Sequence, residues 1–248
     1  MVADAELLRN LRERVLDESE SLAGLLRTCL ALGAVTRSEV LRSWASSELK
    51  GYEGRAEVPD YRKLRLPLYL DSMSISQVYV PGQSVSRYMA PADAQDLIPE
   101  LVSFRAPIED LAGMADSKET HQIRLESLKF AASRWNGARK DGDPWIADLY
   151  YKVSSASLAG VLSVVRTTLV EMVMDMAKDV PLDQLPTRRQ ADAAVHVYVN
   201  GSRDEYHVNV ENNTGVIGQG PAGTQAQHAL SHSGEPWQQR WRSWFRRP

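Results

Sequence analysis

The sequence lacks the pair of cysteines that a disulfide bond needs. Cys29 is the single cysteine among 248 residues, and it lies within the apolar run 25–30. We therefore expect a buried and unreactive thiol. Because one cysteine cannot form an internal disulfide, the composition fits a reducing compartment, and we expect a cytoplasmic protein.

A long apolar run free of charge is also missing. The first six residues are acidic rather than apolar, so they do not predict a secretory leader. Residues 158–176 are long enough to cross a bilayer, but Arg166, Glu171 and Asp175 interrupt them. Since each charge near the bilayer centre costs about 2.5–3.5 kcal/mol, this segment predicts a buried amphipathic helix.

The sequence contains no motif for nucleotide binding, metal binding or nucleophilic catalysis. GxxxxGK[ST], GxGxxG, HExxH, CxxC and GxSxG are all missing. His196 and His207 would need further ligands to hold a metal, and Asp141 and Asp143 fit a turn better than a cation site. We predict no catalytic, cofactor-binding or metal-binding residue. The net charge of −3 excludes a global electrostatic attraction to nucleic acid.

The residues that are present predict a mainly α (α+β) fold. Apolar side chains at helical spacing predict helices within 5–50 and 91–180, the longest over 155–178. Gly33 is expected to end the second helix, and Thr36 with Glu39 forms a capping-box pattern for a third helix over 37–49. A helix is also expected over 121–135. The runs 66–70 and 77–80 predict a small β-hairpin inserted in this helical domain, which we place at 1–180.

Beyond residue 180 the pattern changes. Residues 181–194 are expected to be a linker, and 195–211 a short β-hairpin, because Val195, Val197 and Val199 alternate with polar residues before Asn200-Gly201. Residues 212–236 are rich in Gly, Asn and Gln and predict a flexible segment. Residues 237–248 form a basic aromatic tail.

The tail carries the sharpest functional pattern. In a helix its tryptophans, spaced i, i+4 and i+7, would share one face. Four arginines near an anionic membrane supply roughly 4 kcal/mol, which corresponds to about millimolar affinity. Membrane contact, docking on the protein's own surface and nucleic-acid binding all remain open. The candidate contact residues are Trp237, Arg240, Trp241, Arg242, Trp244, Phe245, Arg246 and Arg247.

Residues 6–180 resemble the AbiTii domain of bacterial abortive-infection proteins. The resemblance rests on the run Leu25 to Leu30, on the segment 39–52 (EVLRSWASSELKGY), on the segment 58–62 (VPDYR) and on the helix 158–166. It implies a role in antiviral defence but carries no catalytic set. The motif residues, for which we expect a structural role, are Glu48, Gly51, Tyr52, Pro59, Tyr61 and Arg62. We expect Glu48, Asp60, Tyr61 and Arg62 to be explained by a salt-bridged turn.

A second resemblance lies in 212–228, where Thr214–Gly220 and Gly223–Gln225 are similar to short amyloid-signalling motifs of bacterial cell-death proteins. Pro221 opposes cross-β stacking, and a flexible linker is the competing interpretation.

Together these features predict a non-enzymatic effector or scaffold. It would form a homo-oligomer and contact an anionic surface of the inner membrane, or a protein partner, through its C-terminal segment. An enzyme acting on nucleic acid or a nucleotide, and an adaptor for a protein partner, are the alternatives.

Overall fold

The computed structural model describes residues 2–74, 76–178, 180–181 and 184–199, with side chains from residue 7 onward. The chain divides into two units, Met1–Tyr206 and His207–Pro248, and all described residues belong to the first. The second half of the expected hairpin (200–211), the Gly/Asn/Gln-rich segment (212–236) and the basic aromatic tail (237–248) lie outside the described residues.

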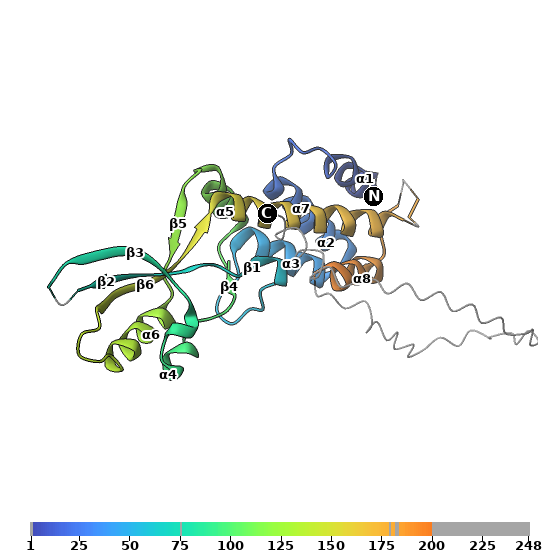
Figure 1. The fold of residues 1–248 in the computed structure, drawn as a ribbon. Helices are drawn as coiled ribbons and strands as arrows, with labels where there is room; N and C mark the ends of the chain where they lie inside the picture. Colours follow the sequence, from blue (N-terminus) through green and yellow to red (C-terminus); the bar gives the residue numbers. More distant parts are fainter. Residues whose placement is uncertain (1, 75, 179, 182–183, 200–248) are drawn as a thin grey trace, which may run out of the picture. The chain divides into compact units, whose positions relative to one another are not determined.

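The first unit is mainly α with an antiparallel sheet, as expected. A group of helices contains α1 (Val2–Arg14), α2 (Leu22–Thr36), α3 (Glu39–Lys50), α5 (Ile108–Asp116), α7 (Ser155–Ala177) and α8 (Arg188–Tyr198). Helix α7 lies at its centre and packs against α1, α5 and α8 (Figure 1). Its buried stripe includes Leu158, Val165, Leu169 and Val173, so the prediction of a buried amphipathic helix is confirmed. By length and composition alone α7 could also cross a membrane, as core helices often can.

Two helix boundaries differ from the expectation. Helix α2 continues past Gly33 to Thr36, and a Cβ at Gly33 would lie 2.9 Å from the Arg42 backbone nitrogen. Glycine at this position therefore allows α2 and α3 to approach closely. The N-cap of α3 is Ser38, whose hydroxyl accepts a hydrogen bond from the Leu41 backbone at 3.1 Å. Thr36 instead donates back to the Leu32 carbonyl at 2.8 Å within α2.

Helix α8 corrects two expectations at once. Residues 188–194 are not a linker, and residues 195–198 are not a strand, because both stretches belong to α8. Thr187 and Gln190 form a capping box at its start. The buried face consists of Ala191, Ala194 and Val195, which have helical spacing and pack against α7 and α3. The small alanine side chains made this face inconspicuous beside the alternating valines.

A four-stranded antiparallel sheet has the order β3-β2-β6-β5. Strands β2 (Leu68–Met73) and β3 (Tyr79–Val85) confirm the expected hairpin. Strands β5 (Thr120–Ile123) and β6 (Trp145–Ser154) were not expected. The predicted helix over 121–135 was wrong at its start, because β5 occupies 120–123 and α6 spans Glu126–Gly137. The remaining short elements are η1 (Asp60–Arg62), η2 (Arg87–Met89), α4 (Ala92–Gln95) and a β-ladder of β1 (Lys63–Leu64) with β4 (Val102–Ser103).

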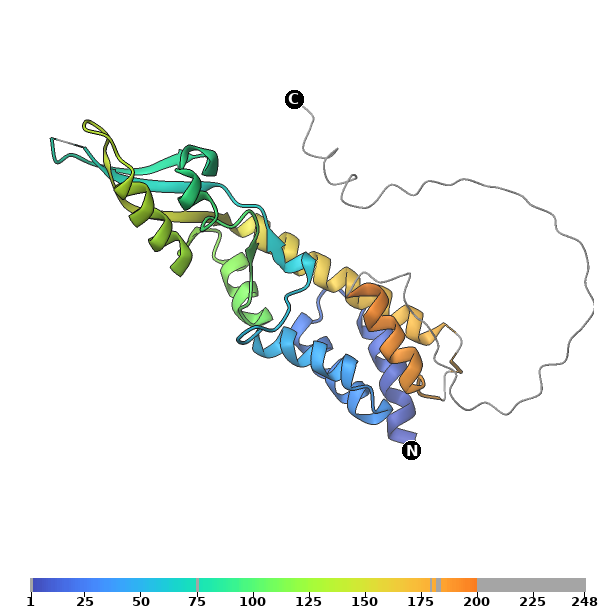
Figure 2. The same cartoon turned by 90° about the horizontal axis from the view of Figure 1, so that it is seen from below.

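One face of this sheet is covered by a helix. Helix α6 packs on β6, and α4 packs against α6. Leu128 and Ala131 of α6 are buried, as are Leu68, Leu70 and Leu149 of the sheet. No described helix lies over the opposite face in either view (Figure 1; Figure 2). We call that opposite face the open face.

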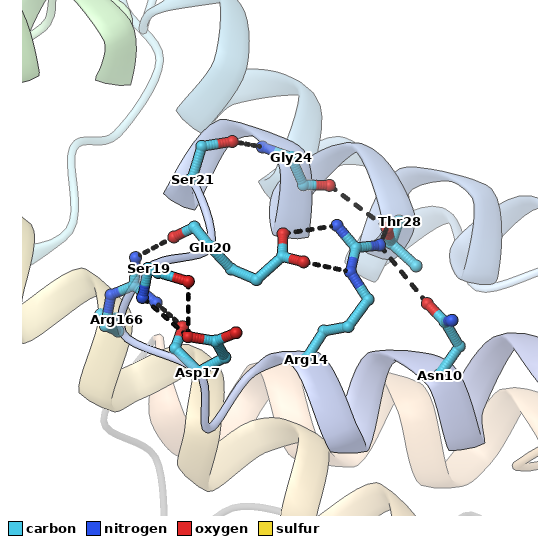
Figure 3. A network of polar contacts seen from close by, with 9 residues as sticks. All are labelled: Asn10, Arg14, Asp17, Ser19, Glu20, Ser21, Gly24, Thr28 and Arg166. Atoms are coloured by element: carbon cyan, nitrogen blue, oxygen red, sulfur yellow. Dashed lines mark hydrogen bonds and ion pairs between the residues drawn. The ribbon is translucent and has the colours of Figure 1, made fainter.

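A polar network fastens the α1–α2 connection to α7 (Figure 3). Arg14 donates two hydrogen bonds to the Glu20 carboxylate, at 2.9 and 2.7 Å, and a third to the Thr28 hydroxyl at 3.3 Å. From α7, Arg166 donates to the backbone carbonyls of Asp17 and Glu20 at 3.3 and 2.5 Å. One arginine therefore shapes the turn, and the other holds that turn against the central helix.

Candidate functional site

The family-motif residues meet in a buried polar cluster, which we call the motif cluster. Glu48 lies in the last turn of α3 and Arg62 in η1, and both side chains are 0% exposed. The Glu48 Oε2 atom accepts hydrogen bonds from Arg62 Nη2 at 2.6 Å and Nε at 3.1 Å. Its Oε1 atom accepts from the hydroxyls of Tyr52 and Tyr61 at 2.6 and 2.8 Å. Four donors thus saturate one carboxylate.

The cluster joins three segments of the chain. Trp44 Nε1 donates to the Tyr61 hydroxyl at 2.8 Å. Arg62 Nη1 donates to the carbonyls of Phe104 and Ala106, at 3.1 and 2.7 Å. Burial together with the neighbouring Glu48 carboxylate raises the pKa of both Tyr52 and Tyr61. The cluster therefore links α3, η1 and the segment before α5 through polar side chains that are hydrogen-bonded to one another or to backbone carbonyls.

The other two motif residues shape the backbone around this cluster. Gly51 has φ +90°, and a Cβ there would lie 2.7 Å from the Arg105 carbonyl oxygen. Pro59 is the N-cap residue of η1, and its carbonyl accepts from the Arg62 backbone at 3.0 Å. Asp60 stays outside the cluster and pairs with Lys63 at 2.8 Å. The expected salt-bridged turn is thus a buried pair between distant segments, and the surface pair at Asp60 is separate from it.

A second cluster lies on the open face of the sheet. Asp71 of β2 is 8% exposed. Its Oδ2 atom accepts from the Tyr79 hydroxyl at 2.5 Å, and its Oδ1 atom from the Gly82 backbone at 2.7 Å and the Tyr150 hydroxyl at 2.9 Å. Although burial opposes ionisation, these hydrogen bonds and the Arg124 charge lower the pKa of Asp71. Burial and the bond to Asp71 raise the pKa of Tyr150 to about 12.

Cationic side chains lie over the rings of this second cluster. Arg124 follows β5, and its guanidinium lies 5.4 Å from the centroid of the Tyr150 ring. It also pairs with Asp148 at 2.8 Å. The ammonium of Lys152 lies 4.1 Å from the Tyr69 ring centroid and 5.9 Å from that of Tyr150. We call Tyr69, Asp71, Arg124, Asp148, Tyr150 and Lys152 the open-face cluster.

Sequence reasoning missed the open-face cluster entirely. Its members come from β2, from β6 and from the residue after β5, and Asp71 lies 79 residues from Tyr150 along the chain. The alternation of Leu68 and Leu70 with Tyr69 and Asp71 was visible inside the expected hairpin. In β6, Asp148, Tyr150 and Lys152 alternate with Leu149 and Tyr151 in the same way, and this part of β6 pairs with Leu68 to Asp71 of β2 in unbroken register. No pattern in the sequence indicates that these two distant strands pair.

The other residues that the sequence analysis considered do not form a site in the described part of the chain. Asp143 caps a turn by accepting from the Lys140 backbone at 2.9 Å. His196 lies in α8, and its expected partner His207 is outside the described residues. Cys29 is fully buried, and burial raises the pKa of its thiol to about 12. Among the residues that the structure describes, no group of three His, Cys, Asp or Glu side chains could hold a metal ion.

A shallow polar depression of about 370 Å³ lies on α2 and α3. Its single carboxylate, Glu39, lies 3.6 Å from Arg42, and no histidine lines it. The other lining side chains are aliphatic, hydroxyl-bearing or cationic: Leu30, Ser43, Ser46, Ser47 and Lys50. This lining contains no set of converging carboxylates or histidines of the kind that acid–base chemistry uses.

Comparison with known proteins places the chain in a family. Neither the curated proteins nor the solved structures gave a match. The AbiTii family model matches residues 6–198, so the match ends at the last residue of α8 and includes both the motif cluster and the open-face cluster. The domain thus reaches further than the boundary at 180 that the sequence suggested, and the chain belongs to the AbiTii family.

Proposed function

We propose that this protein acts in bacterial abortive infection, as an effector whose folded domain is a scaffold and whose C-terminal tail makes the functional contact. The observation that carries the proposal is the family match to residues 6–198, which leaves the basic aromatic tail outside the matched domain. The motif cluster supports the scaffold role, because Glu48 and Arg62 are 0% exposed and satisfied by internal partners. Groups in that state stabilise a fold and are not available to a target.

The tail has the composition of a membrane-interface anchor. Trp237, Trp241 and Trp244 would supply the apolar face, and four arginines would supply the attraction to anionic lipid. A single tail binds at about millimolar affinity from its charges alone. Several tails held in one assembly bind far more tightly through effective concentration. Assembly of copies through residues 212–228 would therefore switch the protein from free to membrane-bound.

Liposome flotation tests this proposal directly. Full-length protein and a variant ending at residue 236 are floated with vesicles of neutral phosphatidylcholine, or of phosphatidylcholine with phosphatidylglycerol, at 50 and 300 mM NaCl. We expect full-length protein to float with the anionic vesicles at low salt, and the shortened variant to remain at the bottom. In bacteria, the shortened variant should lose toxicity on expression. Toxicity retained in full without the tail would refute the proposal.

Matched variants separate the contributions of the tail arginines and of the tail tryptophans to lipid binding. Replacing Arg240 and Arg242 by glutamine removes two of the four tail charges and leaves the aromatic residues unchanged, so binding should weaken and become less sensitive to salt. Replacing Trp241 and Trp244 by alanine should weaken binding at every salt concentration. Equal binding of all four proteins would indicate that a different part of the chain contacts lipid.

A further inference from the structure

The open face combines exposed aromatic rings with cationic groups on a sheet face that none of the described helices covers. At its far end Tyr79 and Trp145 are 50% and 52% exposed. Both pair with Met73, from opposite sides, in the ladder of β3, β2 and β6. Side chains directly opposite one another in such ladders lie on the same face, and neighbouring strands are about 4.8 Å apart. The two rings therefore lie roughly 10 Å apart on one face.

The cations of this face are spread among the rings. Besides Arg124 and Lys152 in the open-face cluster, the guanidinium of Arg139 lies 5.4 Å from the centroid of the Trp145 ring. From Trp145 to Lys152 the strand extends for roughly 20 Å, so ring and cation alternate over a length that can hold several nucleotides. Tyr79 and Trp145 are the half-exposed rings of this face, whereas Tyr150 is 2% exposed and lies beneath the Arg124 guanidinium.

Lys152 is the cation of the open-face cluster that has no carboxylate partner among the described residues, whereas Arg139, outside that cluster, donates to the Asp143 carbonyl at 3.2 and 2.6 Å. Within the described residues no carboxylate lies within ion-pair distance of the Lys152 ammonium, whereas Asp148 already pairs with Arg124. Both oxygens of Asp71 are occupied by the Tyr79 and Tyr150 hydroxyls and the Gly82 backbone. The face therefore offers an unneutralised ammonium while its own carboxylates are engaged.

The chemistry that fits these groups is that of a single-stranded polynucleotide. Bases stack on exposed aromatic rings without needing hydrogen-bond readout, and lysine and arginine contact the phosphates between them. Sheets with one uncovered face are a common platform for this purpose and stack two or three bases. A duplex fits poorly because the flat face presents no helix or ribbon that would enter a groove. A bilayer fits poorly because Asp71 and Asp148 lie within the same face.

We propose that the open face of the sheet binds single-stranded nucleic acid, with Tyr79 and Trp145 stacking bases and Lys152 and Arg139 contacting phosphates. This site is separate from the C-terminal tail, and it does not depend on the proposed membrane contact. Nucleic-acid binding at this site is compatible with the chain's net charge of −3, because the positive charge that would contact the phosphates is local and lies among aromatic rings.

The test measures binding of full-length protein to fluorescein-labelled dT20 and rU20 by fluorescence anisotropy, at 50 and 200 mM NaCl. The variants are Lys152→Gln, Trp145→Ala and the two combined. Lys129→Gln is the matched control, because it removes one positive charge from α6, which packs on the other face of the sheet. Far-ultraviolet circular dichroism checks that each variant remains folded.

We expect Trp145→Ala to weaken binding about tenfold, as loss of one stacked base would. Lys152→Gln should weaken binding and reduce the slope of log affinity against log salt by about 1. Lys129→Gln should stay within about twofold of the parent. If Trp145→Ala does not fold, Lys152→Glu takes its place and should weaken binding more than Lys152→Gln. Comparison of dT20 with rU20 shows whether the face prefers DNA or RNA.

The proposal is overturned if neither oligonucleotide binds, or if Lys152→Gln and Lys129→Gln behave alike. It is also overturned if binding is lost only when the chain ends at residue 236, since the tail would then be the nucleic-acid contact. A parallel flotation with anionic vesicles separates the two proposals: Lys152→Gln should leave flotation unchanged, and loss of flotation in that variant would assign the open face to lipid instead.

Discussion

Removing Arg62 should destabilise this protein more than removing any surface arginine. In an Arg62→Met variant, Glu48 Oε2 loses donors at 2.6 and 3.1 Å, and the carboxylate stays buried beside the two tyrosine hydroxyls on Oε1. Phe104 and Ala106 lose the donor to their carbonyls as well. Removing one partner of a buried pair costs about 3–5 kcal/mol, because an uncompensated charge remains.

That cost converts to a measurable shift in melting temperature. For a domain of this size, 1 kcal/mol shifts Tm by about 2–4 °C, so Arg62→Met should lower Tm by about 6–20 °C. The control is Arg27→Met, which removes the same side chain from an exposed pair with Glu109 at 2.7 Å. An exposed pair contributes about 0–1 kcal/mol, so this variant should melt within about 4 °C of the parent.

A double variant separates the charge from the packing. Adding Glu48→Gln to Arg62→Met removes the buried charge but keeps an oxygen that can accept from Tyr52 and Tyr61. The double variant should therefore recover part of the lost stability and show a coupling energy of about 0.5–3 kcal/mol between the two sites. Thermal unfolding followed at 222 nm, with urea titration as a second probe, gives these values. Our account of the motif cluster is refuted if Arg62→Met and Arg27→Met lose the same stability.

Two further predictions follow from backbone geometry and from titration. Gly51→Ala should cost about 1–3 kcal/mol from its positive φ, with the clash against a backbone carbonyl adding to this. Gly54→Ala, at φ +55° with open space around it, should cost about 1–2 kcal/mol; equal urea midpoints for the two would contradict the role given to Gly51. The pKa of Tyr150 is raised to about 12 from an unfolded value of about 10. Between pH 10 and 12 the folded state therefore keeps the proton on the Tyr150 hydroxyl, whereas the unfolded state loses it. This contribution to stability is fully present below pH 10 and is lost as the pH rises through 12, and Tyr150→Phe should flatten the decline in urea midpoint over that range.

The large apolar helices could be predicted from the sequence because their buried faces consist mainly of leucine and valine. The stripe of α7 (Ser155–Ala177) is an example, since Leu158, Val165 and Leu169 recur at helical spacing. Helix α8 fails the same test because its buried face is mostly alanine, whereas its valines alternate as in a strand. The start of α8 is visible in the sequence as Thr187 followed by Gln190, which form a capping box.

The two clusters differ in predictability for a physical reason. Glu48 and Arg62 are only 14 residues apart, in two neighbouring segments that carry the family resemblance, so the sequence pointed to them even though it did not reveal their buried contact. The open-face cluster needs the pairing of β2 with β6, and Asp71 lies 79 residues from Tyr150, so alternation within each strand does not indicate that the two strands pair. Positions brought together by a sheet become visible only when strand order and register are known.

The contrast between the clusters also decides which experiments can reveal function. A variant in the motif cluster acts on activity through lost stability, because Glu48 and Arg62 have no exposed surface through which to contact a target. Lost toxicity in Arg62→Met would therefore say nothing about the target. Lys152 and Trp145 lie at the surface, and Trp145 is 52% exposed, so their replacement should leave the fold intact. Only variants of this second kind, and of the tail, can connect a loss of defence to a lost contact.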